Sequence, residues 1–454
     1  MRFLDLAPDM APVVGRETIP AHLPERLTIA FWFGYWATDT QPGEGFADLE
    51  QAFRDLVARG FNTVRIDGLW SWCFKPDGTR RAPIEIGSVA DAGYCDYGAG
   101  TAARGGGTVK VLEQLLKLFE LARKYDVYVA LTSWEYQPGH TLGFIADPAI
   151  RQEILDIPVP ARFEYTGLQI DRLLNTIKRE GFADRIAYVE FHNEIDYSIG
   201  LGLPGGSHAL RAAVEKQIAF LRERHPDLLI TDDYSLPCPE QGFDVNVTAD
   251  FIQRLAGNSQ LIDHHLYAWN AGVQVALFRE AGTGIGQTNL DEVLPRLAED
   301  NAQYRWLLKP GSPTWDEYKA HFHSDWFQQW WAPLYLYQNL DIDRWDYWML
   351  RHYPEYEERM RGFWRNGIAA MARHARERNL PLVCDEGYIC WPPTNSEFEP
   401  SAVGRANFDY IMDHMLEAGY WGYMVSTYAF PGQPLWEKQA QWLKTTHERI
   451  LGAK

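Results

Sequence analysis

Short apolar runs alternate with amphipathic stretches along most of the chain. Eight runs have the length and composition of buried strands: residues 27–33, 63–67, 127–134, 186–193, 228–233, 261–267, 381–387 and 422–428. Five stretches carry apolar residues at helical spacing: 46–60, 109–125, 208–225, 358–379 and 435–451. This order predicts a (β/α)8 TIM barrel, although a doubly wound sheet would give the same alternation with fewer strands.

Polar residues gather where several of these predicted strands end. The run IAYVEFHNEID (186–196) passes from apolar residues directly into His192, Asn193, Glu194 and Asp196. The second, sixth and seventh strands end similarly, in Arg65 and Asp67, in Asp263, His264, His265 and Tyr267, and in Asp385 and Glu386. The carboxyl ends of barrel strands share one face, which holds the active site of TIM-barrel enzymes. Polar groups at many different strand ends therefore favour the barrel.

Two connections are long for a compact domain. Residues 68–108 follow the second strand, and residues 268–349 follow the sixth and hold the densest aromatic sequence. Because 268–349 is too apolar for disorder, it predicts an inserted helical, aromatic-rich lid on a single catalytic domain spanning 1–454. The alternative is a dimerisation surface, and the sequence leaves open whether the chain forms a homo-oligomer.

Composition narrows the cellular setting and the partners. The net charge is −18, which argues against nucleic acid as a partner. No stretch approaches the roughly 18 apolar residues of a membrane helix, so no membrane partner is expected. The five cysteines include no Cys-x-x-Cys pair, and the N-terminus lacks a secretion-signal pattern, so a reducing, cytoplasmic location is predicted.

Two glutamates at opposite strand ends are the strongest chemical signal. Paired carboxylates can divide the acid and nucleophile roles when their environments separate their pKa values. Glycoside hydrolysis requires that division. Structural salt bridges are the alternative for Glu194 and Glu386, but Arg, Asn, His and Tyr residues converge on the same face.

Four short motifs resemble clan A of the glycoside hydrolases, in which catalytic glutamates lie on strands four and seven. They are HNEID (192–196), a second glutamate in LVCDEG (382–387), GFNTVRID (60–67) and HLY (265–267). The nearest group is the cellulase-like glycosidases related to family 5. The motifs stand in the family's order and on the matching strands, from about residue 27 to 430.

The resemblance implies a retaining hydrolase of β-D- or α-L-glycosides or oligosaccharides, and no cofactor is expected. Exo action on a short glycoside is an expectation that rests on the predicted lid. Glu194 would be the general acid/base and Glu386 the nucleophile, with the two carboxyls roughly 5–5.5 Å apart.

It also implies supporting roles for four side chains. Asn193 would hydrogen-bond the sugar 2-hydroxyl. Arg65 would hold Glu386 ionised, because a nearby cation lowers a carboxyl pKa. Tyr267 would orient Glu386 by a hydrogen bond, and His265 would contact the sugar or Glu194.

Departures from the family pattern bear on the substrate. Where cellulases of this type show Asp-x-His after the third strand, this chain has Thr132 and Trp134, and the eighth strand offers Tyr428 or Phe430 in place of a tryptophan platform. These differences argue against cellulose as the substrate. The predicted lid and cytoplasmic location suit a pocket that takes a short glycoside from its non-reducing end. Trp134, Tyr388 and Trp391 are the candidates for sugar stacking, with core packing as their alternative.

Two other classes of function remain as alternatives. A non-catalytic sugar-binding protein on the same barrel would keep the aromatic residues but not need both glutamates. A metal-dependent barrel isomerase or lyase would use His264, His265 or the HFH run at 321–323. No metal is expected, because HExxH is absent and adjacent residues of a strand point to opposite faces.

Overall fold

The computed structural model describes residues 10–87, 106–134, 147–195, 206–235, 254–267, 302–314, 339–388 and 395–452, together with positions 252, 316–317 and 320. Its strands are β1 (Leu27–Phe33), β2 (Thr63–Asp67), β3 (Ile84–Glu85), β4 (Thr108–Val109), β5 (Tyr128–Thr132), β6 (Ile186–Glu190), β7 (Ile230–Thr231), β8 (Asp233–Ser235), β9 (Ile262–Tyr267), β10 (Leu382–Tyr388) and β11 (Gly422–Met424). All eight strands expected from the sequence are present.

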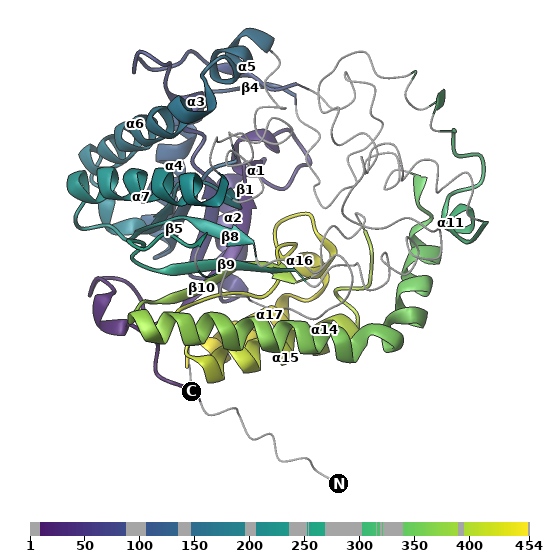
Figure 1. Ribbon diagram of the computed structural model, residues 1–454. Helices are drawn as coiled ribbons and strands as arrows, with labels where there is room; N and C mark the ends of the chain where they lie inside the picture. The colour runs from purple at the N-terminus through teal and green to yellow at the C-terminus, as the bar shows by residue number, and fades with distance from the viewer. Residues whose placement is uncertain are drawn as a thin grey trace.

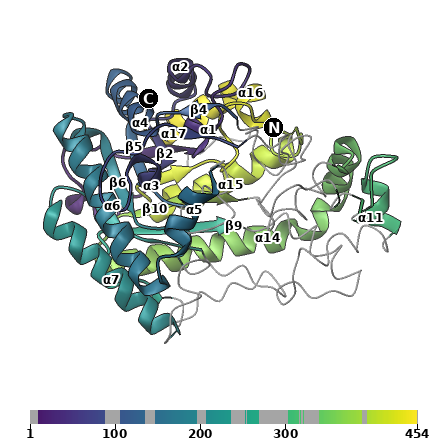
Figure 2. The ribbon, with the colours of Figure 1, turned by 90° about the horizontal axis from the view of Figure 1, so that it is seen from above.

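The longer helices follow the strands in the chain and lie around them (Figures 1 and 2). They are α2 (Leu49–Ala58), α4 (Val111–Lys124), α5 (Pro148–Leu155), α6 (Val159–Arg179), α7 (Gly206–Arg224), α14 (Ile342–Arg378), α15 (Ala402–Ala418) and α17 (Ala440–Ile450). The short ones are η1 (Arg16–Thr18), α1 (Tyr35–Thr38), α3 (Trp70–Cys73), η3 (Ala183–Arg185), α11 (Ala302–Leu307) and α16 (Pro434–Lys438).

The main sheet closes on itself through one short segment of chain. Within the described residues its order is β7-β6-β5-β2-β1-β11-β10-β9-β8, and every pairing is parallel. β7 and β8 stand at opposite ends of that order, yet only Asp232 separates them in the chain. Together they act as a single fifth strand that joins both edges. The predicted (β/α)8 barrel is therefore confirmed.

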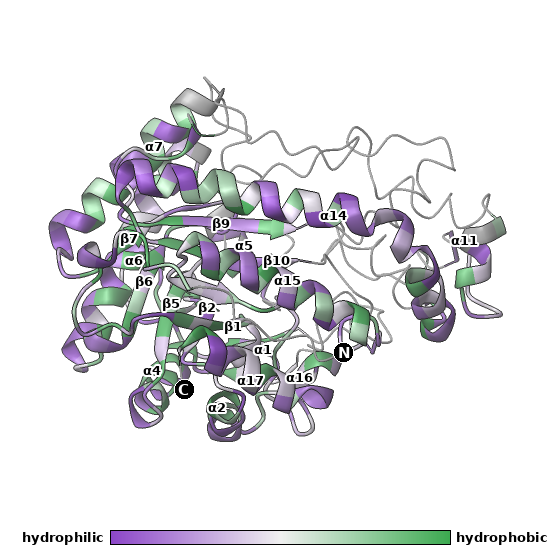
Figure 3. Ribbon diagram, turned by 90° about the horizontal axis from the view of Figure 1, so that it is seen from below, coloured by the Kyte–Doolittle hydropathy of each residue, from purple (hydrophilic) through white to green (hydrophobic). Residues whose placement is uncertain are grey.

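The barrel strands are packed on both sides. Every residue of β1, β2, β5, β6, β10 and β11 is buried, because one face meets the barrel interior and the other meets the helix ring. Hydrophilic residues mark the outer helices, while β9 carries a hydrophilic stretch inside the molecule (Figure 3). That polar strand belongs to the site described below.

Two helix boundaries differ from those that the sequence predicts. The helix expected over 358–379 begins at Ile342 and runs for 37 residues through Pro354 as α14, which bends along its length (Figure 1). A proline lacks one helical N–H but need not end a helix that packing supports. The last residues of the predicted lid therefore belong to α14. The helix expected over 435–451 is divided at Gln439 into α16 and α17.

Both long insertions are described only in part. The first contains α3 and the antiparallel pair β3–β4, and the second contains α11. Most of 268–349 lies outside the described residues, so the lid and the single-domain organisation stay predictions. Over the part of the chain that the structure describes, no helix is both long and apolar enough to span a bilayer.

Candidate active site

Arg65, near the end of β2, is the centre of the polar barrel interior. It is fully buried, and its guanidinium lies 2.6 Å from Glu386, 2.7 Å from Asp385 and 2.8 Å from Glu190. The same group donates a hydrogen bond of 2.9 Å to Asn193 Oδ1. One cation on the second barrel strand therefore fixes side chains from the fourth and seventh strands at the C-terminal face.

Glu386 on β10 is held by donors on both carboxylate oxygens. Arg65 Nη1 donates to Oε1, and the Tyr267 hydroxyl donates to Oε2 at 2.7 Å. These are the contacts that the family resemblance implied. Burial nevertheless raises the pKa of Glu386 to about 7, against the opposing effects of His265 and Arg65. Arg65 thus favours the carboxylate, as expected, but does not outweigh the loss of water.

Glu194 follows β6 and is the more exposed of the two glutamates. Its Oε1 lies 2.8 Å from His265 Nδ1, which is one of the two contacts expected for His265. Its backbone has a φ of 49° and donates its N–H to Asp233 Oδ2 at 2.8 Å. The site thus combines a buried carboxyl group with a partly exposed one.

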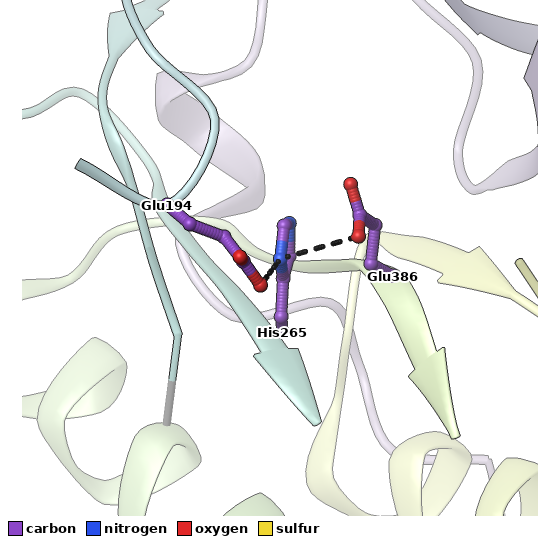
Figure 4. Close-up of side chains that lie close together, drawn as sticks. All are labelled: Glu194, His265 and Glu386. Atoms are coloured by element: carbon purple, nitrogen blue, oxygen red, sulfur yellow. Dashed lines mark hydrogen bonds and ion pairs between the residues drawn. The ribbon is translucent and has the colours of Figure 1, made fainter. Parts of the chain in front are cut away.

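The two glutamates face each other across His265 (Figure 4). A carboxylate oxygen of Glu194, a carboxylate oxygen of Glu386 and a ring nitrogen of His265 all lie within 4.8 Å of one another. Carboxyl groups of retaining glycosidases stand about 5–5.5 Å apart, while those of inverting enzymes stand about 6.5–9.5 Å apart to admit a water. The nearest oxygens of Glu194 and Glu386 are therefore closer together than the wide separation that is typical of inverting enzymes.

A register shift in β10 explains why two consecutive acids reach the same arginine. Val383 pairs with Asp263 and Glu386 pairs with His265, so three steps on β10 match two steps on β9. Such a bulge breaks the normal alternation of side chains between the two faces of a strand. Asp385 and Glu386 can then both contact Arg65, which simple alternation would forbid.

Three buried carboxyl groups lie close together inside the barrel, and none of them is among the predicted site residues. Oxygens of Glu190, Asp263 and Asp385 are within 4.8 Å of one another, and all three side chains are fully enclosed. Burial raises the pKa of Glu190 to about 8, with Arg65 opposing the shift, and also raises that of Asp263. Carboxyl groups in the barrel interior therefore remain protonated at neutral pH. The sequence signal for Glu190 was a charge within an apolar strand run, while Asp263 and Asp385 stood among the polar residues at predicted strand ends.

We expect the proton on Glu190 to make the stability of the fold depend on pH. Glu190 has a pKa of about 8 in the folded chain and about 4.3 when unfolded, so between these values only the folded state holds the proton. Stability must then fall as pH rises through that window. In Glu190→Gln, the unfolding temperature should fall less between pH 5 and pH 8 than in the wild type, as measured by calorimetry.

The control is Glu180→Gln, which removes an exposed carboxylate. It should keep the pH slope of the wild type. A Glu190→Gln slope as steep as the wild-type slope would show that Glu190 is already ionised in the folded protein.

The aromatic candidates for sugar stacking have different surroundings. Trp134 packs edge-on against Phe31 and Phe33, and the guanidinium of Arg65 lies 4.8 Å from the centre of its ring. It is only 3% exposed, so it lines the base of the site and presents little surface to a sugar.

Tyr388 and Trp391 do not lie in the described part of the site. Tyr388 is fully buried, with its hydroxyl donating to the carbonyl of Met424 and lying near the sulfur of Met415 on α15. This favours the core-packing alternative for Tyr388. Trp391 falls outside the described residues.

Two groups of side chains combine metal-ligand atoms: Glu194 with His265 and Glu386, and Glu190 with Asp263 and Asp385. In the first group, carboxylates hold His265 as a cation, with a pKa well above that of free imidazole although burial opposes it. An imidazolium ring is not a metal ligand. In the second group, Arg65 already contacts two of the three carboxylates. Neighbouring His264 points away and meets Tyr420 at 2.8 Å, as strand alternation predicts.

The chain resembles known proteins both in sequence and in fold. A family model described as cellulase-like, "Sugar-binding cellulase-like", matches residues 29–198, which include Arg65, Asn193 and Glu194. This confirms the cellulase-like resemblance over that segment. Comparison with curated protein sequences gave no match.

Three solved structures resemble this chain at low sequence identity. A protein from Parabacteroides distasonis, provisionally named a glycoside hydrolase, is 16% identical with a TM-score of 0.58, over 94% of this chain and 93% of its own. The exo-β-1,4-mannosidase of an Opitutaceae bacterium is 12% identical with a TM-score of 0.45, over 93% of this chain and 54% of its own. A Rhizomucor miehei family 5 mannosidase is 10% identical with a TM-score of 0.42, over 94% and 93%. The first of these likenesses establishes the shared fold.

Proposed function

We propose that the protein is a retaining glycoside hydrolase that acts on short β-D- or α-L-glycosides. The observation that carries this proposal is the close pair Glu194 and Glu386 at the C-terminal face of the barrel, within 4.8 Å of each other and in different surroundings. The cellulase-like sequence match supports the same class of substrate. Exo action is the part of the proposal that rests on the long aromatic segment 268–349.

In the first step, the Glu386 carboxylate attacks the anomeric carbon while the bond to the glycosidic oxygen breaks. Glu194 gives that oxygen a proton, so the leaving group departs as an alcohol. In the second step, Glu194 takes a proton from water, and the water oxygen displaces Glu386 from the anomeric carbon. The free sugar keeps its original anomeric configuration.

Neighbouring residues prepare Glu386 and Asn193 for these steps. Arg65 and Tyr267 offset part of the cost of burying an ionised Glu386. Arg65 also orients the Asn193 amide by donating to its oxygen, and this side chain would meet the sugar 2-hydroxyl.

A panel of nitrophenyl glycosides, followed by NMR of the first-formed anomer, tests the proposal. Hydrolysis of at least one β-D or α-L member with retention is the expected result. Binding of sugars without any turnover would instead support the non-catalytic alternative. Activity that depends on added divalent metal would support the isomerase or lyase alternative.

Replacing Tyr267 with phenylalanine should move the acid limb of the pH profile. The hydroxyl hydrogen bond favours the Glu386 carboxylate, so its loss should raise the pKa of Glu386 further. The acid limb of kcat/KM reports the free enzyme. We expect that limb to lie at higher pH in Tyr267→Phe, measured with the best aryl glycoside.

Tyr128→Phe is the matched control, because its hydroxyl donates to the carbonyl of His22 and Tyr128 stands at the start of β5, whereas Tyr267 stands at the end of β9. Its profile should overlay that of the wild type. An unshifted limb in Tyr267→Phe would mean that Glu386 does not set the acid limb.

A further inference from the structure

We propose that Asp233 is a positioning residue that controls the protonation of Glu194, acting through His265 and through the Glu194 backbone. This rests on the proposed function, because it assumes that Glu194 is the acid/base. Asp233 belongs to none of the motifs that carry the family resemblance. It begins β8, the second half of the split strand, and is completely buried.

One oxygen of Asp233 contacts both the backbone of Glu194 and the ring of His265. Asp233 Oδ2 accepts the backbone N–H of Glu194 at 2.8 Å and lies 2.9 Å from His265 Nε2. The other ring nitrogen of His265, Nδ1, lies 2.8 Å from the Glu194 carboxylate. The imidazole therefore bridges two carboxylates. Asp233 contacts the Glu194 backbone directly and acts on the Glu194 carboxylate through His265.

This geometry favours a hydrogen on both ring nitrogens of His265, since each lies close to an oxygen of a carboxyl group. The other groups around the ring are Asp385 at 3.3 Å, Glu386 at 3.5 Å and the Arg65 guanidinium at 3.5 Å. Carboxylates outnumber the single neighbouring cation, so the surroundings favour an imidazolium. Asp233 supplies the shortest contact at Nε2 and thereby keeps the Nδ1–H directed at Glu194.

The backbone contact has a separate effect. Glu194 occupies a left-handed conformation, with a φ of 49°, which is costly for a residue with a side chain. The hydrogen bond from its N–H to Asp233 stabilises that conformation and so aims the side chain. Without this bond, the Glu194 carboxyl group could turn away from the site.

The chemical consequence concerns the first step of the reaction. When the Glu194 O–H bond breaks and the proton passes to the leaving oxygen, a negative charge is left on Glu194. The imidazolium N–H of His265 stabilises that charge, and Asp233 stabilises the imidazolium. Substrates with poor leaving groups, which need the proton most, should depend most on Asp233.

The test is Asp233→Asn, which keeps the size of the side chain but not its charge. For aryl glycosides with poor leaving groups, kcat/KM should fall roughly 10- to 100-fold, less than the ~10²- to 10⁴-fold of a lost general acid. For dinitrophenyl glycosides it should change little. In a Glu194→Ala background the same substitution should add almost no further loss. Asp232→Asn, one residue earlier, is the structural control. It should lower kcat/KM by the same factor for all substrates.

Equal losses across leaving groups, or a full additional loss in the Glu194→Ala background, would overturn the proposal. A second measurement separates it from the proposed function, because it needs no substrate. In ¹⁵N-histidine NMR, with His265→Gln to assign the signal, His265 should titrate at a higher pH than free imidazole in the wild type, and at a lower pH in Asp233→Asn than in the wild type. A neutral His265 in the wild type at pH 7 would overturn it, whatever the outcome of the glycoside panel.

Discussion

Replacing Glu386 with alanine is expected to lower the hydrolysis of aryl glycosides by roughly 10⁴- to 10⁶-fold, the scale of losses on removal of a catalytic nucleophile. The carboxylate lies between Arg65 and Tyr267, and without it no other described group is placed to form the covalent intermediate. Folding should survive, because the deletion leaves a space at the open face of the barrel. Initial rates and circular dichroism provide the measurement.

Azide should restore part of the activity of Glu386→Ala. The small anion fits the space left by the carboxylate, close to the Arg65 guanidinium, and attacks the anomeric carbon in a single displacement. The product would be a glycosyl azide of inverted configuration, identified by NMR. Glu448→Ala, which removes a surface carboxylate on α17, should be as active as the wild type. Turnover near the wild-type rate in Glu386→Ala would remove Glu386 from the mechanism.

Glu194→Ala should discriminate sharply between leaving groups. A general acid contributes about 10²- to 10⁴-fold, so kcat/KM for poor leaving groups should fall by that amount. Dinitrophenyl glycosides need no proton, and their kcat/KM should change little. The second step loses its base for every substrate, so the intermediate should accumulate and kcat should fall.

Azide again provides the contrast between the two glutamates. In Glu194→Ala it would attack the covalent intermediate, after a first displacement by Glu386, and give a glycosyl azide of retained configuration. If Glu194→Ala lowered kcat/KM equally for all leaving groups, Glu194 would not be the general acid. Inverted azide from both variants would contradict the division of roles.

Much of the barrel could be predicted from the sequence because barrel strands are buried on both faces. Such strands read as short continuous apolar runs, and all eight runs became strands. The polar residues at the strand ends could also be predicted, since they stand at the ends of those apolar runs. They are Arg65, Asn193, Tyr267 and Glu386. Their mutual contacts then follow from the closure of the sheet.

Asp385, Asp233 and Glu190 could not be selected in the same way. Asp385 faces Arg65 only because of the register shift in β10, which no pattern of alternation reveals. Asp233 reaches Glu194 only because the fifth strand is interrupted at Asp232 and the chain completes the barrel there. Glu190 was visible as a charge in an apolar run, but its contact with Arg65 depends on the folded barrel.

Tyr388 shows the opposite difficulty. It follows Glu386 by two residues and therefore looked like a neighbour of the site, yet its ring is buried against α15. Sequence distance from a catalytic candidate does not specify the side of the strand, particularly after a bulge. The start of α14 at Ile342 likewise depends on packing that carries the helix through Pro354.

The most direct test of the proposed mechanism is to trap the covalent intermediate. A 2-deoxy-2-fluoro glycoside with a dinitrophenyl leaving group, made from the sugar that the panel identifies, should inactivate the wild type. Mass spectrometry of the intact protein should show one added sugar, and peptide mapping should place it on Glu386. A label on any other residue, or release of an inverted product without a covalent adduct, would contradict a retaining mechanism with Glu386 as the nucleophile.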